Sequence, residues 1–317
     1  MNIITIILAI IILSSTISGY TRGFILSLSS LLSWIGSLIL MFFLYPYIGD
    51  LLKTIIQNSL WIIPIAILLS LVLTTIIVSL IVNQILEFIP VEAHFNPINK
   101  IIGILPGAVN GLLYATLLSW ILLMMPLSDW ISNETRESKI AQELTLNLER
   151  IEDRLKPEFK EAISRTMQRT IIEEGPDEMI TLPFSVTETS PKPALEQEML
   201  AMVNKEREKH GLRALEADTQ LREVAREHSR DMFARSYFSH VSPDGHTPYD
   251  RAVKFNVRFM TIGENLALAQ TLPIAHDGLM KSPGHRANIL QPAFRKVGIG
   301  IIDGGVYGLM ITQNFKN

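Results

Sequence analysis

The segment IIGILPGAVNGLLYATLLSWILLMM, residues 101–125, contains no charged side chain. A helix needs about 20 apolar residues to cross the roughly 30 Å hydrocarbon core of a bilayer, so this segment is long enough to span it. Backbone amides cannot stay unpaired in lipid, and a helix pairs them within a single segment. The sequence therefore predicts a transmembrane helix here, with the membrane lipid bilayer around it.

Three more apolar segments precede it, at residues 1–18, 24–45 and 60–82, and none carries a charge. The first lacks the basic start and the small-residue cleavage site of a secretory signal peptide, so we expect it to be retained. The alternative, buried helices of a large soluble core, requires four uncharged runs in succession. We therefore predict four transmembrane helices forming a membrane domain at residues 1–126.

Charged residues divide the chain near Ser128. The chain has 28 basic and 31 acidic residues, and those at or before Ser128 are Arg22, Asp50, Lys53, Glu87, Glu92 and Lys100. The rest of the chain is therefore suited to water. Neither part has the basic excess that a phosphate backbone requires, which argues against nucleic acid as a partner. The chain has no cysteine, which excludes disulfides and thiolate metal sites.

Four spans place both chain ends on one side of the membrane, and the loop charges indicate which side. Arg22 and Lys100 lie in the first and third predicted loops, and Lys53 lies in the second. The positive-inside rule then places loops one and three in the cytoplasm, by two basic residues to one. We expect a multi-pass protein of the cell membrane with an extracytoplasmic C-terminal domain.

Glycines recur at four-residue intervals in the last predicted span, at Gly103, Gly107 and Gly111. This spacing puts them on one helical face, where another helix can approach closely. Pro106 and Asn110 lie beside them, and we favour helix packing over a transport path for this face. The sequence leaves open whether the face joins helices of one chain or of a homo-oligomer.

Two membrane segments resemble a known family. GYTRGFILSLSSLLSWIGSLIL, residues 19–40, and NKIIGILPGAVNGLLYATLLSWILLMMPL, residues 99–127, resemble the opening and closing spans of the colicin V production (CvpA) family. The resemblance implies an integral cytoplasmic-membrane protein connected with toxin production or export.

Residues 127–193 form a charged connecting segment. Its apolar side chains recur every three or four residues, as in an amphipathic helix, at Ile140, Leu144, Leu148, Ile151 and Leu155. We expect one helix or a helix pair, broken at Pro157. A stretch rich in Pro, Ser, Thr and Glu follows, which is typical of a linker, so we expect a separate domain at residues 194–317.

The domain at residues 194–317 alternates helical and strand patterns. Helices are predicted at residues 194–210 and 217–234, a strand around residues 260–263, and a β-hairpin over residues 297–315. Together they predict a soluble, layered α+β domain. His228 falls on the apolar stripe of the second helix, so we interpret it as a hydrogen-bonded core histidine that supports the structure.

Three Gly- or Pro-rich loops contain the candidate site residues His240, Glu264 and His285. Loops on a rigid scaffold often display functional side chains. Two imidazoles and a carboxylate can bind Zn²⁺ with one position left for water, or can transfer protons as acid and base. The long spacing between these residues leaves both alternatives open.

The sequence blocks around these residues resemble those of the bacterial branch of the CAP superfamily (cysteine-rich secretory proteins, antigen 5 and pathogenesis-related proteins). The matching blocks are HSRDM, YFSHVSPDGHTPYDR, GENLA, SPGHRANILQPAF, VGIG and TQNF, in this order. The resemblance implies an α-β-α sandwich outside the cytoplasm whose central cleft contains His240, Glu264 and His285. It also implies that Asn265 and Arg286 are structural supports of the cleft loops.

One departure from the family pattern affects the expected chemistry. Animal and plant members carry a second acidic residue before the last cleft histidine, where this chain has Leu279 and Ser282. A two-carboxylate hydrolytic scheme is therefore excluded. A metal such as Zn²⁺ would be held by His240 and His285, with Glu264 or water completing the shell.

Three functions are compatible with these patterns. The first is a membrane-anchored binding module whose cleft takes a cell-envelope ligand, peptide or lipid. The second is a hydrolase of peptide or envelope substrates, metal-dependent or not, with Glu264 as general base and His240 and His285 as metal ligands or acid. The third is a membrane export or channel accessory with a CAP sensor domain.

Overall fold

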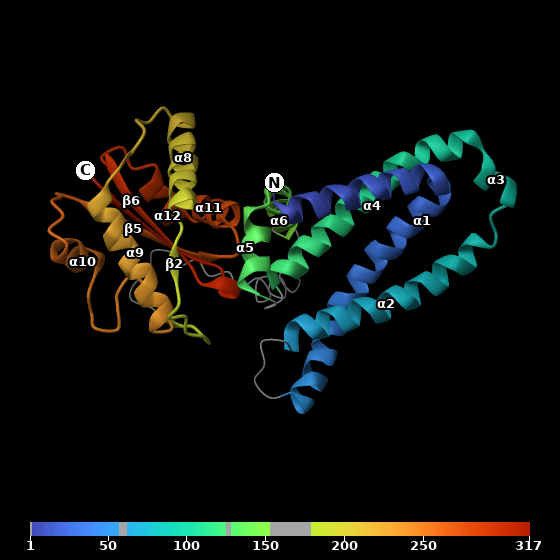
Figure 1. The fold of residues 1–317 in the computed structure, drawn as a ribbon, viewed down its shortest axis with the longest axis horizontal. Coiled ribbons are helices and arrows are strands. Elements are labelled where there is room, and N and C mark those ends of the chain that lie inside the picture. The colour runs from blue at the N-terminus through green and yellow to red at the C-terminus, as the bar shows by residue number, and fades with distance from the viewer. Residues whose placement is uncertain (1, 57–61, 125–127, 153–178) are drawn as a thin grey trace. The chain divides into compact units, whose positions relative to one another are not determined.

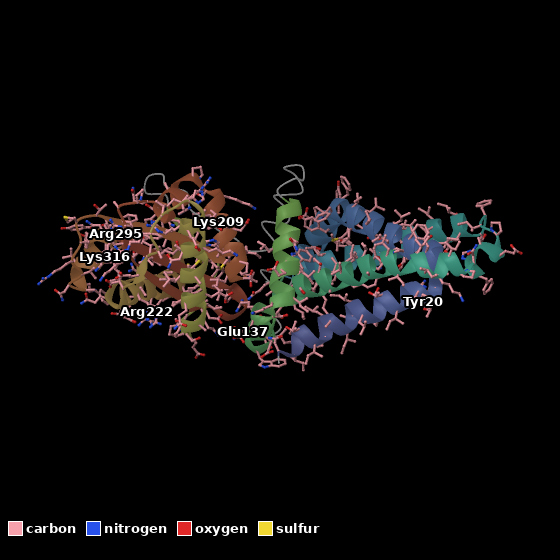
Figure 2. The ribbon with its side chains drawn as sticks, turned by 90° about the horizontal axis from the view of Figure 1, so that it is seen from above. Tyr20, Glu137, Lys209, Arg222, Arg295 and Lys316 are labelled. Atoms are coloured by element: carbon pink, nitrogen blue, oxygen red, sulfur yellow. The ribbon has the colours of Figure 1, made fainter. Side chains whose placement is uncertain are left out.

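The computed structural model describes residues 2–56, 62–124, 128–152 and 179–317 (Figure 1). The chain divides into two compact units between residues 166 and 167. Side chains of the first unit are mostly carbon, whereas nitrogen and oxygen tips are frequent on the second (Figure 2). This contrast agrees with the charge distribution of the sequence.

The first unit is helical. Its elements are α1 (Ile3–Ile55), α2 (Ile62–Leu86), α3 (Val91–Phe95), α4 (Pro97–Met124), α5 (Asp129–Glu137) and α6 (Lys139–Glu152). Among the described residues, three helices are long and apolar enough to cross a membrane, namely those at Ile3–Ile55, Ile65–Leu86 and Pro97–Leu123. Candidate spans are therefore confirmed, but the predicted count of four is not, because the first two predicted spans fall within α1.

A break at Gly23 interrupts α1. Gly23 has φ 83° and ψ 172°, outside the helical region, and Figure 1 shows α1 turning back on itself. Such a φ is rare for residues other than glycine. Asn99 of α4 fixes the break, because its Oδ1 accepts a hydrogen bond from the N–H of Ile25 at 3.0 Å and its Nδ2 donates to the carbonyl of His94 at 3.0 Å.

The glycines of α4 face the first part of α1. A Cβ atom on Gly107 would lie 2.6 Å from Cα of Gly19, and one on Gly103 would meet the backbone of Gly19 and Gly23. A Cβ on Gly111 would lie 2.9 Å from Cα of Ile12. The glycine face therefore packs against another helix of the same chain.

Asn110 also serves this contact between helices. Its buried amide Nδ2 donates to the carbonyl of Ser27 at 2.9 Å. The hydroxyl of Ser15 donates to the carbonyl of Gly107 at 2.9 Å. Interhelical hydrogen bonds of this kind add to close glycine packing in membrane helices.

Part of the connecting segment belongs to the first unit. Ile140 and Leu144 of α6 pack against a small core that includes Ile4, Leu8 and Ala115. The predicted break at Pro157 lies outside the described residues. Residues 179–193 of the predicted linker are described and belong to the second unit, where Leu182 packs in the same core as Met232 and Phe238.

The second unit is an α/β domain. Its elements are β1 (Ile180–Thr181), β2 (Ser190–Pro191), α8 (Pro193–Lys209), β3 (Glu216–Ala217), α9 (Thr219–Ala234), β4 (Tyr237–Phe238), α10 (Pro248–Lys254), β5 (Ile262–Ala269), α11 (Leu272–Lys281), α12 (Pro283–Ile289), β6 (Lys296–Asp303), η1 (Gly305–Tyr307) and β7 (Leu309–Lys316). The main sheet has the order β2-β6-β7-β5, and β3 also pairs with β6. β6 and β7 form the predicted antiparallel hairpin. β5 extends further than predicted, to Ala269, because it is buried on both faces and so lacks alternation.

Helices cover both faces of this sheet. Leu266 and Leu268 of β5 join Met232 and Phe233 of α9 in one core. Asn265 precedes Leu266 and therefore faces the other side of the sheet, where it donates to the carbonyl of His285 on α12. A helix–sheet–helix sandwich follows, with Glu264 on the α9 face at the start of β5.

Candidate functional site

Glu264 is the buried centre of the site. Its side chain is 1% exposed, and Nη2 of Arg251 donates to Oε1 at 2.9 Å and to Oε2 at 2.8 Å. The other guanidinium nitrogen, Nη1, donates at 2.9 Å to the carbonyls of both His240 and His246. Arg251 therefore neutralises Glu264 and fixes the loop that carries His240.

Arg251 lies on α10, a short helix with a well-defined start. Thr247 and Asp250 form a capping box, in which each side chain bonds to the backbone of the other residue. Pro248 follows the cap, where its missing N–H costs no helical hydrogen bond. This local sequence fixes α10 and so places Arg251 against β5.

His240 is oriented by Glu264. Its Nδ1 lies 2.9 Å from Oε1 of Glu264. An ionised carboxylate only accepts hydrogen bonds, so Nδ1 carries the proton, and in the neutral ring Nε2 is left as a base. Nε2 is buried and has no hydrogen-bond partner among the described residues.

The charge state of Glu264 follows from its surroundings. Burial by itself would raise the pKa of Glu264, but the positive charge of Arg251, together with His228 and the His240 hydrogen bond, lowers this pKa to about 2. Glu264 is therefore a carboxylate at neutral pH. Such a weak base is poorly suited to accept a proton from water.

His228 lies beneath Glu264 on the buried face of α9. Its Nε2 donates to the carbonyl of Ser239 at 3.0 Å and lies 3.9 Å from Oε1 of Glu264. Burial lowers the pKa of His228 to about 4, so the ring is neutral at pH 7. The side chain of His228 thus holds the backbone of Ser239, next to His240, in place.

His285, on α12, is fully buried, and neither ring nitrogen has a hydrogen-bond partner among the described residues. Burial, with a smaller contribution from the charge of His240, lowers the pKa of His285 to about 4. A neutral imidazole offers one donor and one acceptor. Both remain available at this position.

A chain of amides holds α12 on the sheet. Asn265 donates at 3.1 Å to the carbonyl of His285 and at 3.1 Å to Oε1 of Gln313, and its own oxygen accepts from Asn288 at 3.0 Å. Asn265 therefore acts on the backbone that carries His285.

Arg286 contacts the end of α8. Its side chain is exposed, and Nη2 donates to Nε2 of His210 at 3.4 Å. This contact ties α12 to the end of α8. It does not involve His240 or Glu264.

Sequence reasoning missed Arg251, although it is the last residue of the YFSHVSPDGHTPYDR block. A signal was present, because a carboxylate buried in a domain core requires a cation or several donors. Gln313 was also missed. It falls within an alternating strand pattern that predicts core positions without distinguishing a buried amide from an apolar side chain.

The site fits a metal only in part. Two imidazoles with unpaired nitrogens, His240 and His285, suit Zn²⁺, and a carboxylate on the remote nitrogen of His240 is the usual second-sphere arrangement. Glu264 itself is occupied by Arg251 and His240. Within the described ranges, no group of three or more His, Cys, Asp or Glu side chains could hold a metal ion. A bound Zn²⁺ would therefore need water or ligand atoms beyond the two histidines.

Comparisons with known proteins match both halves separately. Residues 4–148 match the family model of the colicin V production protein, and residues 200–315 match that of the cysteine-rich secretory protein family. The chain is 39% identical over 113 residues to the uncharacterized protein YkwD of Bacillus subtilis, covering 35% of this chain and 44% of that protein. It is 40% identical over 121 residues to the uncharacterized membrane protein YlbC of the same species, covering 38% and 34%. The chain thus spans less than half the length of these two relatives.

Two solved structures are similar to about two fifths of this chain. An extracellular protein containing a SCP domain from Bacillus anthracis is 37% identical with a TM-score of 0.36, covering 39% of this chain and 40% of that one. An outer surface protein from Borrelia burgdorferi is 21% identical with a TM-score of 0.39, covering 41% and 98%. The two family models confirm both motif resemblances: residues 4–148 are similar to the colicin V production protein family, and residues 200–315 are similar to the cysteine-rich secretory protein (CAP) family.

Proposed function

We propose that this membrane protein displays its CAP domain outside the cytoplasm, where the domain binds a cell-envelope ligand, peptide or lipid, and that the membrane region serves toxin production or export. The observation that carries the binding proposal is the unpaired state of His240 Nε2 and of both His285 ring nitrogens. Buried polar atoms are rarely left without partners. A ligand that supplies donors and acceptors would satisfy them.

Four membrane crossings are part of this proposal. A continuous helix of 53 residues would be about 80 Å long, well over twice the hydrocarbon thickness. The break at Gly23 leaves residues 3–22 before it and 24–55 after it, and each part is long enough to cross once. With α2 and α4, four crossings return the C-terminal domain to the side of the N-terminus.

Cysteine labelling tests this topology, because the chain has no cysteine of its own. We expect Lys205→Cys in α8 and Lys53→Cys to react with a membrane-impermeant maleimide in intact cells. Arg22→Cys and Glu87→Cys should react only after lysis, and all four side chains are exposed. Labelling of Arg22→Cys in intact cells, or protection of Lys205→Cys there, would contradict the proposed orientation.

Binding is tested with the full chain in lipid nanodiscs, sedimented with isolated cell-wall sacculi. We expect the double variant His240→Ala/His285→Ala to lose at least tenfold in retention, because it removes the unpaired ring nitrogens. His210→Ala is the matched control, since this exposed histidine contacts Arg286 instead. Equal retention of the double variant and the control would refute binding through this site.

A second function, hydrolysis, is favoured by the His240–Glu264 contact. A histidine held by a buried carboxylate can accept a proton from water, as the base of a catalytic triad does. His240 would then be the base and Glu264 its orienting partner, which reverses the role expected from the sequence. In the sacculus assay, a hydrolase would release soluble fragments over time, and a zinc-dependent one would do so only with added Zn²⁺. Stable retention without release supports binding alone.

A further inference from the structure

The outer edge of β6 contains a gap. On that side, β2 pairs with Ile302 and Asp303, and β3 pairs with Lys296 and Val297. Ile299 lies between these two short pairings and has no strand partner on this edge. The sheet therefore has an opening about one residue wide, flanked by strands on both sides.

The peptide groups of Ile299 face this opening. The N–H of Lys192 donates to the carbonyl of Ile301 at 2.9 Å, and the N–H of Ile301 donates to Oε1 of Glu196 at 3.3 Å, so Ile301 faces away from β7. In an antiparallel pair this orientation repeats every second residue, so Ile299 faces outward as well. Ile299 is 4% exposed, and among the described residues none of the backbone hydrogen bonds formed outside the strand ladders reaches its N–H or C=O. An unpaired edge of this kind is a template for an added strand.

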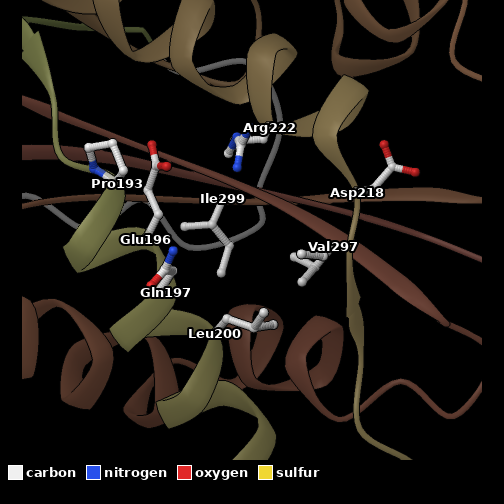
Figure 3. Close-up of a pocket in the computed structure, with 9 residues that line it drawn as sticks. Pro193, Glu196, Gln197, Leu200, Asp218, Arg222, Val297 and Ile299 are labelled. Atoms are coloured by element: carbon white, nitrogen blue, oxygen red, sulfur yellow. The ribbon is translucent and has the colours of Figure 1, made fainter.

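A small pocket of about 50 Å³ occupies the opening. Figure 3 shows Leu200 of α8 below Val297 and Ile299, and Arg222 of α9 above them. The aliphatic side chains of Leu200, Val297 and Ile299 form an apolar floor of this pocket. The pocket thus combines an apolar subsite with an unpaired peptide group.

The charged side chains at the rim differ in how they are paired. Glu196 accepts two hydrogen bonds from Arg226, at 2.8 and 2.7 Å, and Asp218 lies 2.7 Å from Nζ of Lys316. Arg222 instead lies 3.7 Å from Glu223, and its Nε has no hydrogen-bond partner in the described part of the chain. The rim therefore offers donors to an anion at Arg222.

From these features we infer that the β6 gap binds the carboxyl end of a short extended peptide. The peptide pairs with the N–H and C=O of Ile299, its last side chain is aliphatic and packs on Leu200 and Val297, and its carboxylate is bound by Arg222. This site differs from that of His240 and Glu264, because β5 is separated from β6 by β7.

The test uses the full chain in nanodiscs and four probes: N-acetyl-alanyl-valine, its C-terminal amide, its analogue methylated on the valine nitrogen, and isovalerate. Calorimetry should show the free acid binding about tenfold more tightly than the amide, since a charge-assisted contact is lost in the amide. Binding of the N-methyl analogue and of isovalerate should be weaker still, because they lack the N–H for Ile299. Each probe thus removes one of the proposed contacts.

Variants complete the test. Arg222→Gln should weaken the free acid about tenfold and leave the amide unchanged. Arg230→Gln is the matched control, because it lies on the same helix, is equally exposed at 38% and also neighbours a glutamate. Leu200→Trp should abolish binding by filling the floor. Equal binding of acid and amide, equal effects of the two arginine variants, or isovalerate as tight as the peptide would each overturn the inference.

Discussion

Replacing Arg251 with methionine is expected to destabilise the CAP domain by about 3–5 kcal/mol, the usual cost of leaving a buried charge without its partner. Glu264 would lose the guanidinium that contacts both of its oxygens. The loop would lose the two hydrogen bonds that Arg251 makes to the carbonyls of His240 and His246. Methionine keeps an unbranched apolar stem and removes the guanidinium, so the loss is mainly one of charge and hydrogen bonding.

Hydrogen exchange of β5 peptides in the full chain measures this loss, because core amides exchange through large openings of the domain. Arg235→Met is the matched control, since Arg235 also forms a two-point ion pair, with Asp244, but on the surface. We expect an effect of about 1 kcal/mol or less there. Adding Glu264→Gln to Arg251→Met should recover part of the stability. Similar losses in the two arginine variants would show that Glu264 does not depend on Arg251.

Hydrogen exchange of the β5 peptides should also depend on pH, in a direction that the pKa shifts determine. The pKa of Glu264 is lowered from 4.5 to about 2. Its contribution to the free energy of unfolding is therefore complete above pH 4.5 and is lost as the pH falls through 2. The pKa values of His228 and His285 are lowered from 6.5 to about 4, so the unfolded chain binds more protons in that interval. Stability should therefore fall as the pH decreases from 6.5 to 4. In the Arg251→Met variant the pKa of Glu264 rises, because the carboxylate has lost its cation. The difference in stability between the variant and the wild type should therefore shrink as the pH decreases.

The fold could be predicted from the sequence where burial produces a periodic pattern. The apolar runs predicted the membrane helices, and the alternation around Ile299 and Ile311 predicted the hairpin, because each pattern reflects a single buried face. The sequence did not predict the non-helical backbone at Gly23 inside α1. Its position depends on Asn99, some 75 residues later, which bonds to the backbone beyond the break. The extent of β5 was underestimated because a strand buried on both faces loses its alternation.

The site was predictable in residue type but not in role. His240, Glu264 and His285 were singled out from their loops and from the family resemblance, and the structure places His240 against Glu264. The role of Glu264 depends on Arg251, which occurs in the sequence as an ordinary helical arginine. Asn265 and Arg286 were both expected to support the cleft loops, and they make different contacts: Asn265 bonds to the carbonyl of His285, whereas Arg286 bonds to His210. Direction of a side chain is a tertiary property that spacing alone does not fix.

Alanine at both Gly103 and Gly107 is expected to disrupt the packing of α1 on α4 and to lower the stability of the membrane unit by at least ~3 kcal/mol, the upper part of the usual range for overpacking. The new methyl groups would meet backbone atoms of Gly19 and Gly23, which no rotamer change can move aside. The helices would have to separate. That separation would also break the hydrogen bond from Ser15 to the carbonyl of Gly107.

Tryptophan fluorescence during denaturation in sodium dodecyl sulfate measures this effect on the membrane unit alone. All four tryptophans lie at or before Trp130, so the CAP domain does not contribute to the signal. Gly36→Ala and Gly49→Ala are matched controls, because their new Cβ atoms would lie 3.4 Å from Val78 and 3.7 Å from Ala66, ordinary packing distances to side chains. If the control variants lose as much stability as the Gly103/Gly107 pair, helix flexibility rather than close approach explains the glycines. If the pair unfolds early and the controls do not, the four-residue glycine spacing is what holds α4 against α1.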